Sequence, residues 1–217
     1  MSNSFRIILT GAPAAGKGTI SKLIIKTFDF VHISPGDILR QNIRSNTKLG
    51  KEAKKFIDEG KLVPDKVVSD ILKKRLLELK QKSIILDGYP RTLKQAETLK
   101  EWICVDAVLN LIVPHEEIIR RAKNRWIHLP SGRVYNIGFS EPKVPGKDDV
   151  TGEDLVQRDD DKPEVLKKRL QIYDKIMNPV LNFYAKQKLL THFEPKCDET
   201  MWQKVEKFMM KLVCGKD

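Results

Sequence analysis

The sequence predicts an α/β protein built on a doubly wound, parallel sheet of five strands. Short apolar runs alternate along the chain with longer segments whose apolar residues recur at helical spacing. The apolar runs lack the polar alternation of a half-exposed strand, which is typical of strands that helices cover on both faces. A glycine-rich turn also stands between the first apolar run and the first helical segment, as in many folds of this class.

The predicted elements follow from these patterns in chain order. The first helix is expected from Lys17 because Ile20, Leu23 and Ile24 lie at helical spacing. Asp37 is the expected cap of the helix that Ser34 opens. The predicted strands are 6–9, 31–33, 83–87, 107–113 and 189–193. The predicted helices are 17–28, one from 34 to about 43, 48–57, 65–80, 92–103, 114–126, 163–186 and 200–213.

The alternation stops between residues 127 and 161. This segment contains several glycines and prolines and has no helical periodicity. Its residues 131–136 have the pattern of a turn that leads into a small strand. We therefore expect a small, mobile β unit inserted into the main fold.

Composition excludes several classes of protein. The 217 residues carry a net charge of +11, and 41% of them are hydrophobic, as expected for a folded domain with one main core. No apolar run approaches a membrane span, and the first residues leave no room for a cleavable signal. The basic residues form no dense stripe, which disfavours nucleic acid as a partner. Cys104, Cys197 and Cys214 form no framework and indicate a reducing compartment.

A phosphate-binding loop is predicted between the first strand and the first helix. The Gly-x4-Gly-Lys spacing in this position is that of a P-loop. Its glycines let backbone N–H groups turn toward phosphate oxygens, and the helix start adds its positive end. Lys17 supplies a full charge to the β- and γ-phosphates. The expected contacts of the triphosphate in this loop are Gly11, Ala14, Ala15, Gly16, Lys17, Gly18 and Thr19.

The loop departs from the general pattern at its end. Lys17 is followed by Gly18 before Thr19, so the hydroxyl that usually ligates Mg²⁺ comes one residue late. Direct ligation by Thr19 is therefore not expected. Asp87 ends a predicted strand, and we predict that it holds Mg²⁺ together with the nucleotide, mainly through water. The alternative is that Asp87 caps the next helix.

Five motifs in this order resemble the long-lid adenylate kinases over nearly the whole chain. They are the loop at 11–19 and the segments 34–40, 87–92, 130–135 and 147–152. The segments 126–128 and 155–164 are similar to those of one branch, the GTP:AMP phosphotransferases of the mitochondrial matrix. The resemblance implies a core of residues 1–33, 64–126 and 162–217, an AMP-binding region at 34–63 and a lid at 127–161.

The resemblance also implies a second nucleotide site. Arg40 and Arg91 would bind the phosphate of AMP, which suits the guanidinium fork. Gln95 would reach the adenine, and Pro35 stands where many relatives have a threonine that contacts AMP, so that contact is missing or replaced. The implied AMP-binding residues are Pro35, Arg40, Lys61, Leu62, Val63, Gly88, Arg91, Gln95, Arg158 and Arg169.

Further arginines match the family pattern. Arg121 and Arg125 are four residues apart in a predicted helix and are expected to share its face. The resemblance implies that these two and Tyr135 contact the triphosphate, and that Asp160 and Asp161 interact with lid and phosphate-site groups. Phosphoryl transfer needs alignment and positive charge but no general base here. The implied catalytic residues are Lys17, Arg91, Arg125, Arg158 and Arg169.

The lid carries two side-chain pairs at the spacing of a zinc site. Some relatives have cysteines there, but this chain has His128 with Ser131 and Asp148 with Thr151. Serine and threonine are poor zinc ligands. We therefore expect a hydrogen-bonded cluster in the lid and no structural zinc.

The leading hypothesis is reversible transfer of the γ-phosphate of GTP to AMP, with Mg²⁺ as the cofactor. ATP is the alternative donor, and the lid-side backbone near Trp126 is where the base would be distinguished. A P-loop regulatory switch is the hypothesis of another class, but a switch needs no second phosphate site. The resemblance places the protein in the mitochondrial matrix, with the cytoplasm as the alternative, as a monomer without nucleic-acid or membrane partners.

Overall fold

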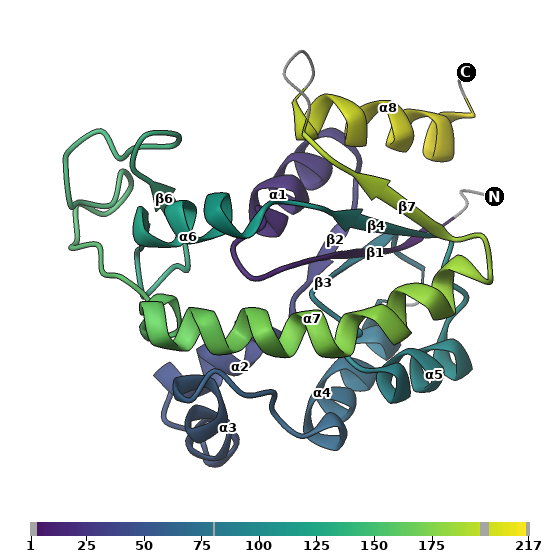
Figure 1. Ribbon diagram of the computed structural model, residues 1–217, viewed down its shortest axis with the longest axis horizontal. Coiled ribbons are helices and arrows are strands. Elements are labelled where there is room, and N and C mark those ends of the chain that lie inside the picture. Colours follow the sequence, from purple (N-terminus) through teal and green to yellow (C-terminus); the bar gives the residue numbers. More distant parts are fainter. Residues whose placement is uncertain (1–3, 80, 196–199, 216–217) are drawn as a thin grey trace.

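The protein is built around a parallel sheet, described here from a computed structural model of residues 4–79, 81–195 and 200–215. The sheet has five strands in the order β2-β3-β1-β4-β7, and every neighbouring pair is parallel (Figure 1). The predicted five-stranded parallel sheet is therefore confirmed. The strands are β1 (Arg6–Gly11), β2 (Val31–Ile33), β3 (Ile84–Asp87), β4 (Ala107–Leu111) and β7 (Leu190–Phe193).

Helices cover both faces of this sheet (Figure 1). The described helices are α1 (Lys17–Thr27), α2 (Pro35–Arg44), α3 (Lys48–Asp58), α4 (Asp65–Glu78), α5 (Leu93–Trp102), α6 (His115–Lys123), α7 (Pro163–Ala185) and α8 (Met201–Cys214). α1, α6 and α8 pack on one face, and α4 and α5 pack on the other. The long α7 contributes to both sides, since Leu166 belongs to the first cluster and Met177 to the second.

Alternate residues of β1 explain why this central strand is apolar. Ile7 and Leu9 pack with Ile24 of α1, whereas Ile8 packs with Leu72 of α4. All of these side chains are buried. Because β1 buries both of its faces from Ile7 onward, it has no solvent-facing position that would favour a polar residue, whereas the edge strand β7 leaves His192 exposed.

α2 and α3 form a helical hairpin beside the sheet (Figure 1). They meet at Gly50, where an added Cβ would lie only 2.2 Å from the carbonyl oxygen of Asn42. Pro35 begins α2, where its missing N–H leaves no helical bond unmade. The expectation that Asp37 caps this helix is wrong: Ser34 Oγ accepts the Asp37 N–H at 3.3 Å, and the Asp37 carboxylate pairs with Arg40.

The helix predicted at 114–126 ends early. α6 stops at Lys123, and β5 (Arg125–Ile127) pairs antiparallel with β6 (Val134–Asn136). The side chain of Asn136 donates to the Arg121 carbonyl at 2.9 Å, so the lid itself satisfies the end of α6. Arg121 and Arg125 therefore do not share a helix face, because tertiary pairing overrides the local helical pattern.

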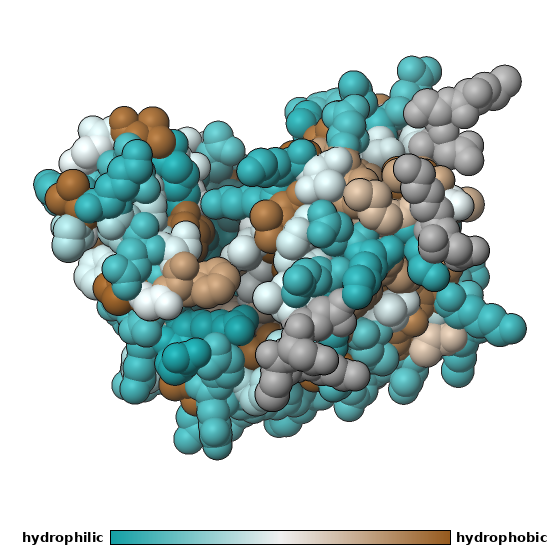
Figure 2. Space-filling model, turned by 90° about the horizontal axis from the view of Figure 1, so that it is seen from above, coloured by the Kyte–Doolittle hydropathy of each residue, from teal (hydrophilic) through white to brown (hydrophobic). Residues whose placement is uncertain are grey.

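The two-stranded unit and the loops after it project from one end of the core. Figure 2 shows this lobe separated from the rest of the surface by a hollow. β5 crosses the predicted boundary between residues 126 and 127, and the division into three regions stays a prediction. A short 3-10 helix, η1 (Asp159–Asp161), returns the chain to α7. Lys80 and Cys197, named among the expectations above, lie outside the described residues.

Candidate phosphoryl-transfer site

The phosphate-binding loop joins β1 to α1, and its backbone conformation explains its glycines. Gly16 has φ 93°, in the left-handed region, and serves as the N-cap of α1. Gly11 has φ 147°, and an added Cβ there would lie 2.7 Å from the Leu111 carbonyl oxygen. As a glycine, Gly16 has no side chain that could cap the first turn of α1. The first amides of this helix are therefore available to an anion, as in other phosphate-binding loops.

Lys17 lies in the hollow of this loop. Its Nζ donates to the carbonyl oxygens of Gly11 and Ala12, both at 2.8 Å. The pKa of Lys17 is lowered to about 7, mainly by burial; Asp87 opposes this shift, and the positive charges of Arg91 and Arg169 contribute to it. A triphosphate bound in the loop would place negative charge beside Lys17, which favours the protonated form of this side chain.

Asp87 stands at the carboxyl end of β3, beside the loop. One of its carboxylate oxygens lies 3.1 Å from Nε2 of His32, on the neighbouring strand β2. The alternative in which Asp87 caps the next helix is wrong, because Thr92 caps α5 by accepting the Gln95 N–H at 3.2 Å. Thr19 is exposed in the first turn of α1. Sequence reasoning did not identify His32, which only the pairing of β2 with β3 brings to this carboxylate.

A cavity extends from the loop toward α2 and α5. Its wall changes from polar near Lys17 to apolar near Val68 and Met177, so it suits a phosphate at one end and a base at the other. The structure thus brings most of the predicted AMP-binding residues to one cavity with the loop. The predicted residues that line it are Gly11, Lys17, Pro35, Arg40, Lys61, Leu62, Val63, Gly88, Arg91, Gln95 and Arg169.

Arginines gather at the polar end of the cavity. Arg91 Nε donates to the Gly88 carbonyl at 2.7 Å, and Arg169 Nη1 donates to Asp160 Oδ2 at 2.7 Å. Burial lowers the pKa of Arg91 to about 10, with a further contribution from the positive charges of Arg169 and Arg40. Several cations are therefore held close together with few anions between them, an arrangement that a bound phosphate would stabilise.

Arg158 and Arg125 approach this cluster from the lid side. Burial lowers the pKa of Arg158 to about 10, and the nearby charges of Arg40 and Arg125 add to the effect. Arg158 Nε is buried and has no hydrogen-bond partner among the residues that the structure describes. Arg125 Nε donates to Asp161 at 2.6 Å. An unpaired guanidinium N–H next to other cations is a ready donor for an anionic ligand.

Asp160 and Asp161 balance part of this positive charge. Burial raises the pKa of Asp160, but Arg169 and Arg40 outweigh it and hold the pKa below its usual range. Both carboxylates lie on η1, at the hinge between the lid and α7. The sequence pattern of three consecutive aspartates pointed to them, although it did not separate them from a solvated acidic run.

Two predicted triphosphate contacts have other partners in this structure. Arg121 Nε pairs with Glu117 at 2.8 Å, yet its Nη1 lies 3.5 Å from the place of a Cβ on Gly16, beside the loop. The Tyr135 hydroxyl donates to Asp148 at 2.9 Å and accepts the Asp149 N–H at 2.9 Å. The O–H of Tyr135 is therefore committed to Asp148, and a contact of Tyr135 with the triphosphate stays a prediction.

The lid contains a hydrogen-bonded cluster at the two predicted pairs. His128 Nδ1 lies 2.7 Å from Ser131 Oγ, and Thr151 Oγ1 donates to Asp148 at 3.0 Å. Arg133 forms two further bonds to Asp148, at 2.7 and 2.5 Å, and its hydrogen bonds are the main reason why the pKa of Asp148 is strongly lowered. Among the described residues, no group of three or more His, Cys, Asp or Glu side chains is placed to hold a metal ion.

Gln95 is buried at the base end of the cavity, with 3% of its surface exposed. Its Oε1 accepts the Arg91 N–H at 2.7 Å, and its Nε2 donates to Asp65 Oδ1 at 2.7 Å. Asp65 begins α4 and is 30 residues away in sequence. Sequence reasoning did not identify Asp65, since a single aspartate at a helix start has an ordinary structural explanation.

The chain is similar to known proteins of one family. The family model described as adenylate kinase matches residues 9–189. A protein of Drosophila melanogaster called mitochondrial GTP:AMP phosphotransferase is 57% identical over 205 residues, which cover 94% of this chain and 95% of that protein.

Proposed function

This chain belongs to the adenylate kinase family, and on that premise we propose that it transfers the γ-phosphate of GTP to AMP, reversibly, giving GDP and ADP. The observation that carries the proposal is the single cavity that joins the phosphate loop to Gln95 through the arginine cluster. A donor triphosphate in the loop and an acceptor phosphate on Arg40 and Arg91 would meet there. The name of the Drosophila relative supports GTP as the donor.

The proposed mechanism uses alignment and positive charge. Lys17 and the amides at the start of α1 hold the donor phosphates. Arg91 binds the acceptor phosphate, and Arg158 and Arg125 approach from the lid side to neutralise charge on the transferred group. The acceptor phosphate is already anionic, so no side chain has to remove a proton. Closure of the lid excludes water, which would otherwise hydrolyse the donor.

The residues near the loop fit a magnesium ion that arrives with the nucleotide. Mg²⁺ uses one or two carboxylates together with substrate phosphates and water, and Asp87 supplies one buried carboxylate beside Lys17. We propose that Asp87 holds the ion through water. When bound, the ion neutralises charge on the donor phosphates.

A coupled assay of ADP formation from AMP tests the choice of donor. GTP and ATP are supplied in turn at equal concentrations with Mg²⁺, and initial rates are compared over a range of donor concentrations. We expect a higher kcat/KM with GTP. Equal or faster turnover with ATP would contradict GTP as the preferred donor while leaving AMP kinase activity intact.

We also propose that the protein works in the mitochondrial matrix as a monomer. The location is supported by the name of the relative. Among the described residues, no helix combines the length and the apolar character that crossing a membrane requires. Size-exclusion chromatography with light scattering measures the oligomeric state, and a mass near 24.9 kDa is expected for a monomer.

A further inference from the structure

The side-chain amide of Gln95 is held in one orientation. The Arg91 backbone N–H can only donate, so the atom that faces it, 2.7 Å away, must be the amide oxygen of Gln95. The carboxylate of Asp65 can only accept, so the atom that faces it, also 2.7 Å away, must be the amide nitrogen. These two partners together determine the positions of the amide oxygen and the amide nitrogen of Gln95.

Asp65 is itself fixed by a neighbouring element. Its second oxygen, Oδ2, accepts the Thr92 hydroxyl at 2.9 Å, and Thr92 caps α5 through the Gln95 N–H. The start of α4 and the start of α5 are thus tied together around the amide. Asp65 does not line the cavity, whereas Gln95 does.

The fixed amide has one hydrogen and one lone pair left for a ligand. The six-amino edge of adenine offers a donor and an acceptor, which one order of amide atoms can match. A 6-oxo purine offers the reverse order on the same edge, with an acceptor at position 6 and an N–H at position 1. To bind that base, Gln95 would have to turn over, which sets two donors against each other at Arg91 and two acceptors against each other at Asp65.

We infer that Asp65 is a positioning residue that selects the acceptor base: it fixes the amide of Gln95 in the orientation that fits 6-amino purine nucleotides and rejects 6-oxo purine nucleotides. The inference rests on the proposed function, because it assumes that the acceptor base lies at this end of the cavity. The inference adds that Asp65, which does not itself touch the base, determines selectivity by fixing the side chain of Gln95, which does.

A pair of variants at position 65 separates the acceptor atom from the charge. Asp65→Leu removes both acceptor oxygens, so only the Arg91 N–H still fixes the amide of Gln95 and turning it over meets one clash in place of two. Asp65→Asn removes the same charge from the start of α4 but keeps one oxygen for Gln95 and an amide for Thr92. Both variants lose the favourable charge at the helix N-terminus to the same extent, so a difference between them reports the hydrogen bond.

The measurement is kcat/KM for AMP and for IMP with GTP as the donor, in the wild type and both variants. IMP differs from AMP at position 6 and in the proton on N1, so the ratio of the two values isolates the edge that the amide meets. We expect the preference for AMP to fall at least tenfold in Asp65→Leu, on the order of what one misplaced buried hydrogen bond costs in selectivity. Asp65→Asn is expected to stay within about threefold of the wild type.

The ratio also distinguishes selection from a general loss of stability, which lowers both values together. If Asp65→Leu does not fold, as judged by circular dichroism, Asp65→Ala takes its place. An unchanged ratio in the variant without an acceptor overturns the inference, as does an equal loss in Asp65→Asn. A wild-type enzyme that phosphorylates no AMP overturns the proposed function itself, whereas an active wild type with an unchanged ratio overturns only the role of Asp65.

Discussion

At the residue scale, Lys17 combines two hydrogen bonds to loop carbonyls with an unusually low pKa. A neutral amine has two N–H groups, which matches the two loop carbonyls that accept from it at 2.8 Å. Its pKa of about 7, lowered mainly by burial, means that the lysine loses its proton readily while the loop holds no anion. The lowered pKa costs stability below about pH 7, and this cost disappears as the pH rises toward the usual value of 10.5.

Nucleotide binding is therefore expected to take up a proton at alkaline pH. A triphosphate raises the pKa of Lys17, so binding at pH 8 takes up close to one proton at this residue, and binding at pH 6 takes up almost none. Calorimetry of MgGTP binding in buffers of different ionisation enthalpy measures the uptake. The Lys17→Met variant should lose the difference between the two pH values, and its persistence there would assign the proton to another group.

Arg91 is expected to be essential for use of the acceptor. Its guanidinium lines the cavity and, among the residues that the structure describes, donates only to the Gly88 carbonyl, so its remaining donors can reach a phosphate. Arg91→Ala should lower kcat/KM for AMP by about 10³-fold. The matched control is Arg75→Ala, which removes an exposed arginine paired with Glu78 on α4. If both variants keep full turnover, the acceptor site is misplaced.

The residues that could be predicted are those inside contiguous motifs. Lys17, Arg40 and Arg91 each belong to a sequence motif that matches the family pattern, so their roles could be predicted from the sequence. Asp65 and Arg44 have partners 27 to 85 residues away and belong to ordinary helix ends. Their roles depend on the packing of whole helices, which local sequence patterns do not contain.

At the scale of elements, the lid depends on a network of side chains centred on Asp148. Its carboxylate accepts from Arg133, Tyr135 and Thr151 and is buried. Removing one member of such a network leaves buried donors unsatisfied. The lid is therefore expected to loosen without unfolding the five-stranded sheet, because the described hydrogen-bond partners of this carboxylate lie within residues 133–151.

Asp148→Ala tests this separation. We expect faster amide hydrogen exchange over residues 125–158 and a fall in kcat of roughly ten- to a hundredfold, because catalytic groups near the lid lose alignment. Exchange in β1 and β4 should stay close to that of the wild type. Asp154→Ala is the control, because Asp154 is an exposed lid carboxylate paired only with Lys147. Equal exchange in the two variants would contradict the structural role of Asp148.

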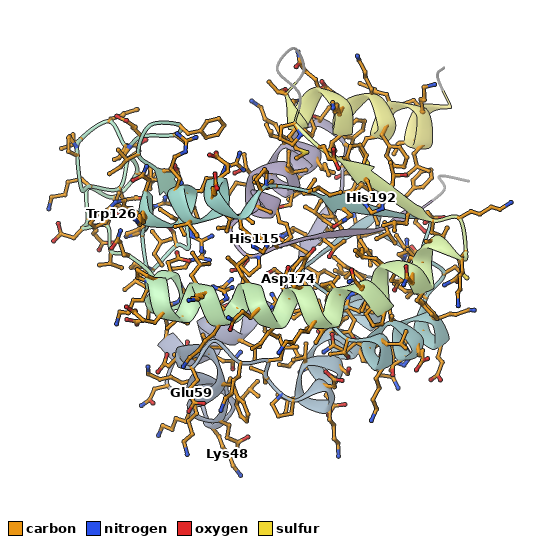
Figure 3. All side chains as sticks on the ribbon, in the orientation of Figure 1. Lys48, Glu59, His115, Trp126, Asp174 and His192 are labelled. Atoms are coloured by element: carbon orange, nitrogen blue, oxygen red, sulfur yellow. The ribbon has the colours of Figure 1, made fainter. Side chains whose placement is uncertain are left out.

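Most helices and strands were predicted within a few residues, and the error at α6 shows where such predictions fail. Residues 124–126 continue a helical pattern locally, but Trp126, labelled in Figure 3, pairs with Tyr135 in the lid sheet. The energy of that pairing comes from a strand that begins only at Val134, after a turn at 129–131. Short strands with few apolar residues carry too little local signal to compete with an adjacent helix.

At the scale of the whole molecule, a hydrogen bond joins the predicted AMP-binding region to the predicted lid. Arg44, in the last turn of α2, donates to the carbonyl oxygen of Leu129 in the lid. The two residues are 85 positions apart and belong to the two regions on either side of the arginine cluster. We therefore expect closure of one region to favour closure of the other.

Arg44→Ala should weaken this coupling. An exposed hydrogen bond contributes about 0.5 kcal/mol or slightly more, so KM for both nucleotides is expected to rise about two- to threefold together. Steady-state kinetics with each substrate varied in turn measures both constants. Lys48→Ala, at the start of α3 and labelled in Figure 3, removes a nearby cation without this contact. A rise in only one of the two constants would argue against coupling.

The parallel five-stranded sheet followed from the sequence because it belongs to the fold class, whereas the order of its strands was not predicted. A phosphate loop after the first strand places the donor at the carboxyl edge of a parallel sheet, and Asp87 ends a strand at the same edge. The contact between Arg44 and the lid could not be predicted, since it depends on how far two inserted regions close over that edge.

The close approach of α2 and α3 at Gly50 has a mechanical consequence. Since even one methyl group would strike the backbone of Asn42, the two helices are in close backbone contact there, which opposes sliding or rotation of one against the other. We expect them to move together as one rigid unit when a nucleotide binds. The backbone would then bend at the two ends of this unit, near Ser34 and near Gly60, whose φ of 71° marks a turn. Small rotations there would carry Arg40 through an arc toward the phosphate loop.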